Sequence, residues 1–281
     1  MSDGLDEIGY WTEIKLQILR EYASAYATIL RRQSSIRHYA YIDGFAGAGT
    51  HVSKATGLEV EGSPAIALSL DFSHYHFVDM CGTRAARLRK LAGERANVSV
   101  YQGDCNKVLL DDVLPTCRYE DYRRALCLLD PYGLNPDWEV VQTAGQMRSI
   151  EIFLNFMIMD ANMNVLWTSP DRVSESQLKR MDAFWGDRSW QDAAYRRTRG
   201  LFGDIPEKTS NESVIAAYQK RLREVAGFQY VPEPIPMRNT QGAVVYYLFF
   251  ASHNQTGDRI ARQIFRKYRD FGDRDGAEVQ H

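Results

Sequence analysis

The sequence has little that would suit a secreted, metal-binding or membrane protein. Its 281 residues include only four cysteines, Cys81, Cys105, Cys117 and Cys127, and no Cys-x-x-Cys pair. Scattered cysteines fit neither a disulfide framework nor a zinc site, so we predict reduced, buried thiols and no metal. No hydrophobic run approaches the length of a membrane span, and the acidic start "MSDGLDEIGYW" lacks the apolar core of a signal peptide. We therefore expect a soluble, cytoplasmic protein with no membrane contact.

An excess of positive charge is also missing. Lysine and arginine number 34 against 36 aspartates and glutamates, so binding to nucleic acid would need a local basic patch. The arginine-rich segments at 31–39, 118–124, 195–200 and 259–269 are each more simply explained as solvated charge. The segment "FWGDRSWQDAAYRRTRG" (184–200) interleaves aromatic residues with arginines, as surfaces that stack bases and bind phosphates do.

Hydrophobic spacing predicts an α/β fold. Residues 10–33 carry Ile14, Ile18, Tyr22, Ala25 and Ile29 on one face of a helix. After this helix, strands and helices alternate, and the strands are apolar on both faces, which is typical of a parallel sheet covered by helices. Strands are predicted at 38–45, 75–80, 97–104, 124–133, 151–158 and 243–252, and helices at 63–70, 83–94, 105–115 and 258–271.

The middle of the chain breaks this alternation. Residues 160–240 are polar and less periodic, and they end in the proline-rich "VPEPIPM". We predict four parts: an N-terminal helical segment (1–37), a Rossmann-like cofactor-binding core (38–159), an inserted element suited to substrate recognition (160–240), and a final strand and helix that complete the core (241–281).

A glycine-rich turn follows the first predicted strand of the core. In "YIDGFAGAGT" the glycines permit a tight turn and a close backbone approach to a ligand. Taken alone, this turn is a weak signal, and an ordinary strand-to-helix connection explains it equally well. If it binds a cofactor, the residues concerned are Asp43, Gly44, Phe45, Ala46, Gly47 and Gly49.

Acidic residues also follow the next three strands. Asp79 ends the second strand, where a carboxylate can bind ribose hydroxyls, and Asp104, followed by Cys105, ends the third, where it can receive an adenine amino group. The fourth strand ends in Asp130-Pro131-Tyr132-Gly133. Because open parallel sheets bind ligands at the carboxyl ends of their strands, these residues should meet in one crevice.

This order resembles the class I S-adenosylmethionine-dependent methyltransferases. They share a D-x-F-x-G-x-G loop, acids after the second and third strands, and a tetrad after the fourth, and the resemblance covers residues 39–158. The whole chain is also similar to the three-Cys-motif partner family (TcmP), through "WTEIKLQILREY", "YIDGFAGAGT", "GSPAIAL", "LLDPYGL" and "YYLFFASHNQTGDRIARQI". A dinucleotide oxidoreductase would explain Asp79 but gives no role to "DPYG". The resemblance implies S-adenosylmethionine as cofactor and a three-cysteine-motif protein as partner.

The resemblance also implies roles for the tetrad. Asp130 would accept a hydrogen bond from a target amino group, Pro131 would offer its carbonyl, Tyr132 would stack on a base, and Gly133 completes the turn. "DPYG" is closer to the D-P-F-G of tRNA guanine-N2 methyltransferases than to the adenine-N6 pattern. We predict methyl transfer to nitrogen, on an exocyclic amine of a nucleobase in RNA or DNA. The alternatives are a small-molecule methyltransferase and a non-catalytic binding module for the three-cysteine protein.

Lys15, on the first helix, is similar in place to an N-terminal lysine near the cofactor in some adenine methyltransferases. We expect it instead to be an exposed helix lysine.

Overall fold

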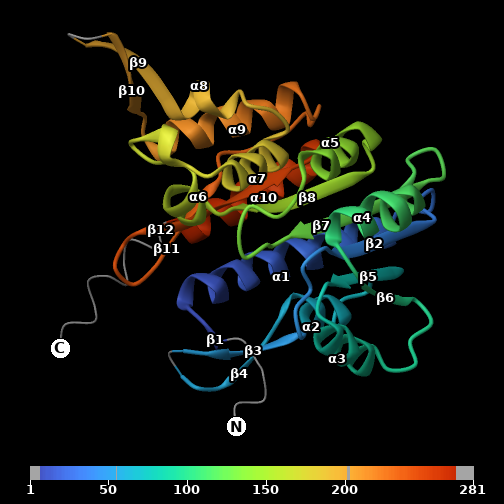
Figure 1. Cartoon of the computed structure of the whole chain (residues 1–281). Helices are drawn as coiled ribbons and strands as arrows, with labels where there is room; N and C mark the ends of the chain where they lie inside the picture. The colour runs from blue at the N-terminus through green and yellow to red at the C-terminus, as the bar shows by residue number, and fades with distance from the viewer. Residues whose placement is uncertain (1–6, 55, 201–202, 270–281) are drawn as a thin grey trace.

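Seven strands form the main sheet of the protein (Figure 1). The computed structural model describes residues 7–54, 56–200 and 203–269. The strands lie side by side in the order β11 (Ile235–Arg238), β12 (Val244–Ala251), β8 (Ile150–Phe156), β7 (Arg123–Leu129), β2 (His38–Asp43), β5 (His74–Asp79) and β6 (Val98–Gln102).

The chain reverses its direction of travel across this sheet next to β2. Strands β2, β5 and β6 run outward to one edge, and the chain then returns to place β7 on the other side of β2. All neighbouring pairs among β2, β5, β6, β7 and β8 are parallel, whereas β12 pairs antiparallel with both β8 and β11. The arrangement is a mostly parallel α/β sheet of the Rossmann-like type, and its topological switch point lies between β2 and β7.

Alternating side chains on each strand supply two hydrophobic layers. Tyr41, Leu126 and Phe153 belong to one buried cluster, and their neighbours Ile42 and Cys127 belong to the other. The first layer is covered by α1 (Tyr10–Arg31), α2 (Ser63–Leu68), α3 (Gly82–Ala92) and α10 (Gln255–Arg269). The second is covered by α4 (Cys105–Val108), α5 (Trp138–Met147), α6 (Ile158–Asn164), α7 (Glu175–Trp185), α8 (Trp190–Ala194) and α9 (Asn211–Glu224).

Most of the predicted elements are confirmed, including the long first helix, which is α1. The helix expected at 105–115 is instead three short pieces, because α4 passes into a π-helical turn (Leu109–Val113) and then a 3-10 turn (Leu114–Cys117) that contains Pro115. A small second sheet was not predicted. It joins β1 (Glu7–Ile8), β3 (Thr50–Ser53) and β4 (Glu59–Glu61) below the main sheet in Figure 1.

The segment predicted as an insertion is tied closely to the core. Its "VPEPIPM" run, expected to end the inserted element, provides β11, an edge strand of the main sheet, where proline is tolerated. Helices α7, α8 and α9 share the hydrophobic layer of the sheet. Only the hairpin of β9 (Tyr195–Gly200) and β10 (Gly203–Lys208) extends away from the body, at the upper left of Figure 1.

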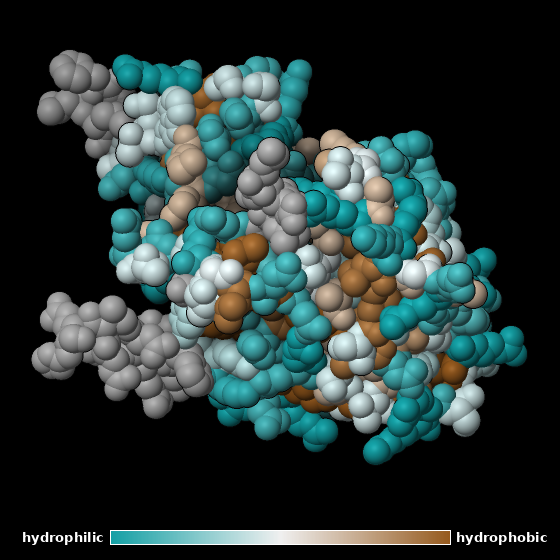
Figure 2. Space-filling view, turned by 90° about the horizontal axis from the view of Figure 1, so that it is seen from below, coloured by the Kyte–Doolittle hydropathy of each residue, from teal (hydrophilic) through white to brown (hydrophobic). Residues whose placement is uncertain are grey.

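The surface offers no sign of a membrane span. No helix within the described residues is long and apolar enough to cross a bilayer. On the face drawn in Figure 2, hydrophobic residues form separate groups among hydrophilic ones. Cys81, which we expected to be buried, is exposed because it lies beyond the end of β5, next to the exposed Met80.

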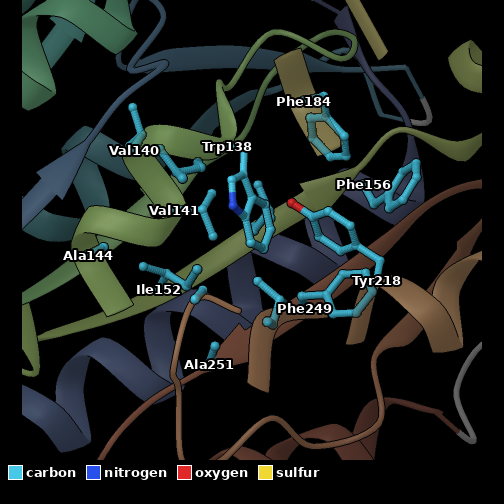
Figure 3. Close-up of a cluster of buried hydrophobic side chains, with 14 of the residues drawn as sticks. Trp138, Val140, Val141, Ala144, Ile152, Phe156, Phe184, Tyr218, Phe249 and Ala251 are labelled. Carbon is cyan, nitrogen blue, oxygen red and sulfur yellow. The ribbon is translucent and has the colours of Figure 1, made fainter. Parts of the chain in front are cut away.

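An aromatic cluster joins α9 to the sheet (Figure 3). The ring of Tyr218 on α9 lies between 5.0 and 5.5 Å, centroid to centroid, from those of Phe156, Phe184 and Phe249. Its hydroxyl is directed toward Trp138 and has no hydrogen-bond partner among the described residues. The ring therefore stabilises this part of the protein, while the buried hydroxyl carries an unmet desolvation cost.

This division predicts opposite results for two substitutions at one position. Tyr218→Phe keeps the ring and removes the unpartnered hydroxyl, so we expect the free energy of unfolding to stay equal or rise by up to about 1 kcal/mol. Tyr218→Ala leaves a large cavity and should lower it by about 3–5 kcal/mol. Urea denaturation of the three proteins measures both. A clear loss of stability in Tyr218→Phe would show that the hydroxyl has a partner.

Candidate functional site

The carboxyl ends of three parallel strands bring three aspartates to one edge of the sheet. Asp43 ends β2, Asp79 ends β5, and Asp130 directly follows β7. Strand β2 pairs with β5 on one side and with β7 on the other, so these carboxylates flank the switch point. Ligands of open α/β sheets bind at this place.

The glycine turn is shaped by its neighbours. Gly44 packs so closely on Cys105 that a Cβ at position 44 would lie 2.8 Å from the Cys105 sulfur. Gly47 and Gly49 have φ angles of +65° and +84°, in the region that favours glycine. A Cβ built on Gly47 would meet no atom within 4 Å, although the residue is buried, so a small open space adjoins the turn here.

Asp79 fastens the glycine turn to the start of α3. One of its carboxylate oxygens accepts the Gly47 N–H at 3.0 Å, and the other accepts the Cys81 N–H at 2.7 Å. A carboxylate oxygen has room for a second donor, so Asp79 can shape the turn and still accept a hydroxyl from a ligand. Phe45 and Ala46 lie in the same turn, where the Ala46 N–H donates to the Val78 carbonyl at 2.9 Å.

Asp104, the acid that follows β6, lies at the protein surface. Asp104 is exposed and caps α4, since its carboxylate accepts the Lys107 N–H at 3.0 Å. The neighbouring Cys105 is buried beneath Gly44, and burial raises the pKa of its thiol. Cys105 thus contributes to the packing of the turn, whereas Asp104 stands at its rim.

Asp43 is fully buried below the turn. Its carboxylate accepts the Ser63 hydroxyl at 2.5 Å and the Phe45 N–H at 3.2 Å. Burial raises the pKa of Asp43 to about 7, and the nearby charge of Asp130 adds to the rise. Asp43 therefore titrates close to neutral pH, and at that pH a part of the population carries no charge.

Asp130 is held from two sides. The Lys15 ammonium of α1 forms an ion pair with one carboxylate oxygen, and the Asn155 side-chain amide of β8 donates to the other. The expectation of an exposed Lys15 was wrong: the residue is only 5 % exposed. The inner face of α1 lies on the sheet and directs Lys15 toward the strand ends, where a buried cation needs an anionic partner.

The rest of the tetrad forms a short loop fixed by Asp160 of α6. Its carboxylate accepts the Leu134 N–H at 3.2 Å, and the Arg180 guanidinium of α7 lies 2.6 Å from the same oxygen. Pro131 and Gly133 are buried, whereas Tyr132 is 69 % exposed. The Arg84 guanidinium lies 5.6 Å from the centroid of the Tyr132 ring.

Two of the arginine-rich segments lie away from this site, and the segment 184–200 contributes mainly to the core. Three of the four aromatic residues of 184–200 belong to the core instead of a stacking surface, because Phe184, Trp185 and Trp190 are at most 2 % exposed, while Tyr195 is partly buried. Residues of the segments 31–39 and 118–124 line a cavity of about 800 Å³ where β7 and β8 begin, at the opposite edge of the sheet.

Sequence reasoning missed the residues that hold the site together. Four side chains contact Asp43, Asp130 or the tetrad loop from distant positions in the sequence: Lys15, Ser63, Asn155 and Asp160. A signal existed for Asp160, since an acid following β8 extends the pattern of acids after the other parallel strands. The contact of Lys15 with Asp130, 115 residues away, has no signature in the hydrophobic pattern, and the signal for it was the similarity in place to an N-terminal lysine near the cofactor in some adenine methyltransferases.

The residues at this edge fit a nucleoside-containing cofactor. Asp79 and Asp104 offer carboxylate acceptors at two neighbouring strand ends, and the space beside Gly47 would be filled by any larger side chain. Asp43, fully buried at the base of the turn, supports the turn through the Ser63 hydroxyl and the Phe45 N–H.

Comparison with solved structures supports the fold. Protein LPL1258 of Legionella pneumophila superposes with a TM-score of 0.53 at 10 % identity, over 90 % of this chain and 91 % of that one. The DszA carbon methyltransferase gives a TM-score of 0.38 at 14 % identity, over 81 % and 50 %. A chain from the complex of the Haloferax volcanii Trm112 methyltransferase activator gives 0.35 at 11 %, over 88 % and 95 %. At these identities the likeness to LPL1258 shows an α/β fold alone.

No family model matches the chain. No curated protein matches it either. The similarity to the three-Cys-motif partner family therefore stays a prediction.

The raised pKa of Asp43 predicts a pH dependence of stability. Asp43 has a pKa of about 7 when folded against an ordinary value of 3.8, so the folded state binds a proton more tightly than the unfolded one. The free energy of unfolding should therefore fall as the pH rises from about 4 to about 7. Glu151, whose pKa burial raises from 4.5 to about 7, adds to this fall.

Asp43→Asn keeps an acceptor for the Phe45 N–H and removes the titrating group. We expect the loss of stability between pH 4 and 7 to be smaller in this variant than in the wild type. Urea denaturation at several pH values checks this, with the exposed Asp71→Asn as control. An unchanged pH profile in Asp43→Asn would contradict the assignment.

Proposed function

We propose that the protein is an S-adenosylmethionine-dependent methyltransferase that acts on nitrogen, on an exocyclic amine of a nucleobase. The observation that supports this most is the placement of Asp43, Asp79 and Asp130 around one switch point, together with the exposed Tyr132. The glycine turn and the acids would bind the cofactor, and the tetrad would bind the target.

Different residues of the turn and the neighbouring strand ends would bind different parts of the cofactor. Bound S-adenosylmethionine supplies an electrophilic methyl group on a sulfonium. Asp79 would accept the ribose hydroxyls, and Asp104, after the next strand, would accept the adenine amino group. Gly47 leaves the backbone of the turn bare toward open space, so that the ligand could approach it closely, whereas Gly44 and Gly49 are packed against Cys105 and Leu91.

Asp130 would orient the target nitrogen. Its carboxylate is fixed by Lys15 and Asn155, and each oxygen still has a lone pair for an amino hydrogen. A fixed acceptor aligns the amine with the methyl group without any motion at the moment of reaction. Tyr132, exposed at the same loop, provides a ring on which a base can stack.

A base within a nucleic acid would have to be single-stranded or turned out of a helix to reach this edge. The proposal of RNA or DNA rests on the tetrad and on Tyr132, because the segments 31–39 and 118–124 lie at the far edge. A nucleoside or another small amine fits the same chemistry. Association with a three-cysteine-motif protein is proposed from the family resemblance alone.

Cofactor binding is the first test. Calorimetric titration with S-adenosylmethionine and S-adenosylhomocysteine should show saturable one-to-one binding. Transfer of a labelled methyl group to RNA, DNA and nucleosides then identifies the substrate class. Folded protein that binds neither compound would favour a non-catalytic binding module.

Asp130→Asn separates catalysis from cofactor binding. The substitution preserves shape but loses the charge that pairs with Lys15, so we expect methyl transfer to fall on the order of 100-fold. Affinity for S-adenosylhomocysteine should change by less than about threefold, because Asp130 faces the target. The exposed Asp112→Asn is the control. An equal loss of affinity and rate would remove Asp130 from its proposed role.

Asp79→Asn should weaken cofactor binding, which Asp130→Asn should leave nearly unchanged. The asparagine side chain has one acceptor oxygen, and its nitrogen is only a donor, so one of the Gly47 and Cys81 N–H groups loses its acceptor. The turn therefore loosens and a ribose acceptor weakens. We expect the dissociation constant for S-adenosylhomocysteine to rise about tenfold or more, measured by the same titration. Unchanged affinity would place the cofactor elsewhere.

A further inference from the structure

Asp160 contacts the loop that contains the tetrad, although it lies on a different element of the fold. It lies in α6, directly after β8, and its side chain is 18 % exposed. One carboxylate oxygen, Oδ2, accepts the Leu134 N–H at 3.2 Å. A Cβ built on Gly133 would lie 3.0 Å from that same oxygen, so the loop passes against Asp160 with no space for a larger residue.

Two further groups hold the Asp160 carboxylate in this position. The Asn164 amide, one turn along α6, donates to Oδ1 at 2.7 Å. An Arg180 guanidinium nitrogen, from α7, lies 2.6 Å from Oδ2. Both oxygens are thus engaged, and the ion pair with Arg180 is sheltered because that side chain is only 31 % exposed.

The contacts form one continuous connection from the inserted element to the tetrad. Arg180 belongs to α7, which packs in the same hydrophobic layer as α5 and α9 and therefore has a fixed place. Through Asp160, the position of α7 determines the position of the Leu134 N–H and of the turn at Gly133. The loop that carries Asp130 and Tyr132 is thereby bounded on both sides, by Lys15 and Asn155 at its start and by Asp160 at its end.

We infer that Asp160 is a positioning residue for the 130–134 loop, and that Arg180 of the inserted element clamps it there. The inference deepens the proposed function, on which its catalytic part rests. Asp160 itself would touch neither cofactor nor target. It sets where the exposed Tyr132 ring and the Asp130 carboxylate stand relative to one another, which determines the alignment of a bound base.

The matched control lies on the neighbouring helix. Asp182 of α7 is 22 % exposed, pairs with Arg188 at 3.0 Å and accepts the Trp190 indole N–H at 2.8 Å. It resembles Asp160 in burial and charge, but its contacts stay within the inserted element. A loss of stability common to both sites would therefore be seen in Asp182→Ala as well.

The first measurement does not depend on catalysis. Amide hydrogen exchange on the full-length protein should show the Leu134 amide exchanging about tenfold faster in Asp160→Ala than in the wild type, because its acceptor is gone. Asp160→Asn, whose side-chain oxygen can still accept this N–H, should restore most of the protection. In Asp182→Ala the Leu134 amide should exchange as in the wild type. Unchanged exchange in Asp160→Ala would overturn the inference.

The second measurement is kinetic, on the substrate found by the methyl-transfer screen. Asp160→Ala and Arg180→Met should lower kcat about tenfold or more, with affinity for S-adenosylhomocysteine within about twofold of the wild type. Arg188→Met, the control for Arg180→Met, should leave kcat unchanged. Gly133→Ala crowds the same contact from the loop side and should lower kcat in the same way.

The outcomes separate the test of the proposed function from the test of the role of Asp160. A wild-type protein that binds no cofactor sinks the proposed function, while the exchange of Leu134 still decides whether Asp160 holds the loop. Faster exchange with an unchanged kcat would overturn the positioning role. A fall in kcat that Asp160→Asn restores together with Leu134 protection supports it.

Discussion

The ion pair between Lys15 and Asp130 is the contact on which the arrangement of this site depends. Lys15 is almost fully buried, and a buried ammonium without a partner would cost several kcal/mol. Asp130 and the ring of Tyr246, 5.9 Å from the ammonium, surround it. The first helix of the chain is thereby fixed against the end of β7 and the start of β12. A segment that looks like an N-terminal addition in the sequence is in fact a wall of the site.

The same edge contains several carboxyl groups, which would repel one another if all were charged. Each of these carboxylates has different neighbours. Asp130 faces a cation, Asp79 accepts two backbone N–H groups, and Asp43 lies among a hydroxyl, one N–H and apolar neighbours, with a pKa of about 7. Neighbouring acids held in unlike surroundings can take unlike roles. Asp43 can remain partly neutral below the turn while Asp130 stays paired with Lys15, as its proposed role as an acceptor for the target requires.

The predictions from sequence succeeded where the signal is local. The glycine turn and the acids after β2, β5 and β7 could be found because strand ends follow directly from hydrophobic runs, and parallel strands bring their ends to one edge. The rest depends on tertiary packing. Whether Lys15 faces solvent is decided by which side of α1 lies on the sheet, and the aromatic residues of 184–200 became a core because Tyr218, from a later helix, packs among them.

The inserted element shows why its role could not be read from its composition. Its arginines and aromatic residues suggested a surface for nucleic acid, but Arg180 binds the Asp160 carboxylate, and it is this carboxylate that contacts the tetrad loop. Helix α6 connects the two regions at a second point, since Asn162 accepts from Lys208 of β10 at 2.9 Å and donates to Asn211 of α9 at 3.0 Å. The hairpin of β9 and β10 is therefore anchored to the helix that carries Asp160.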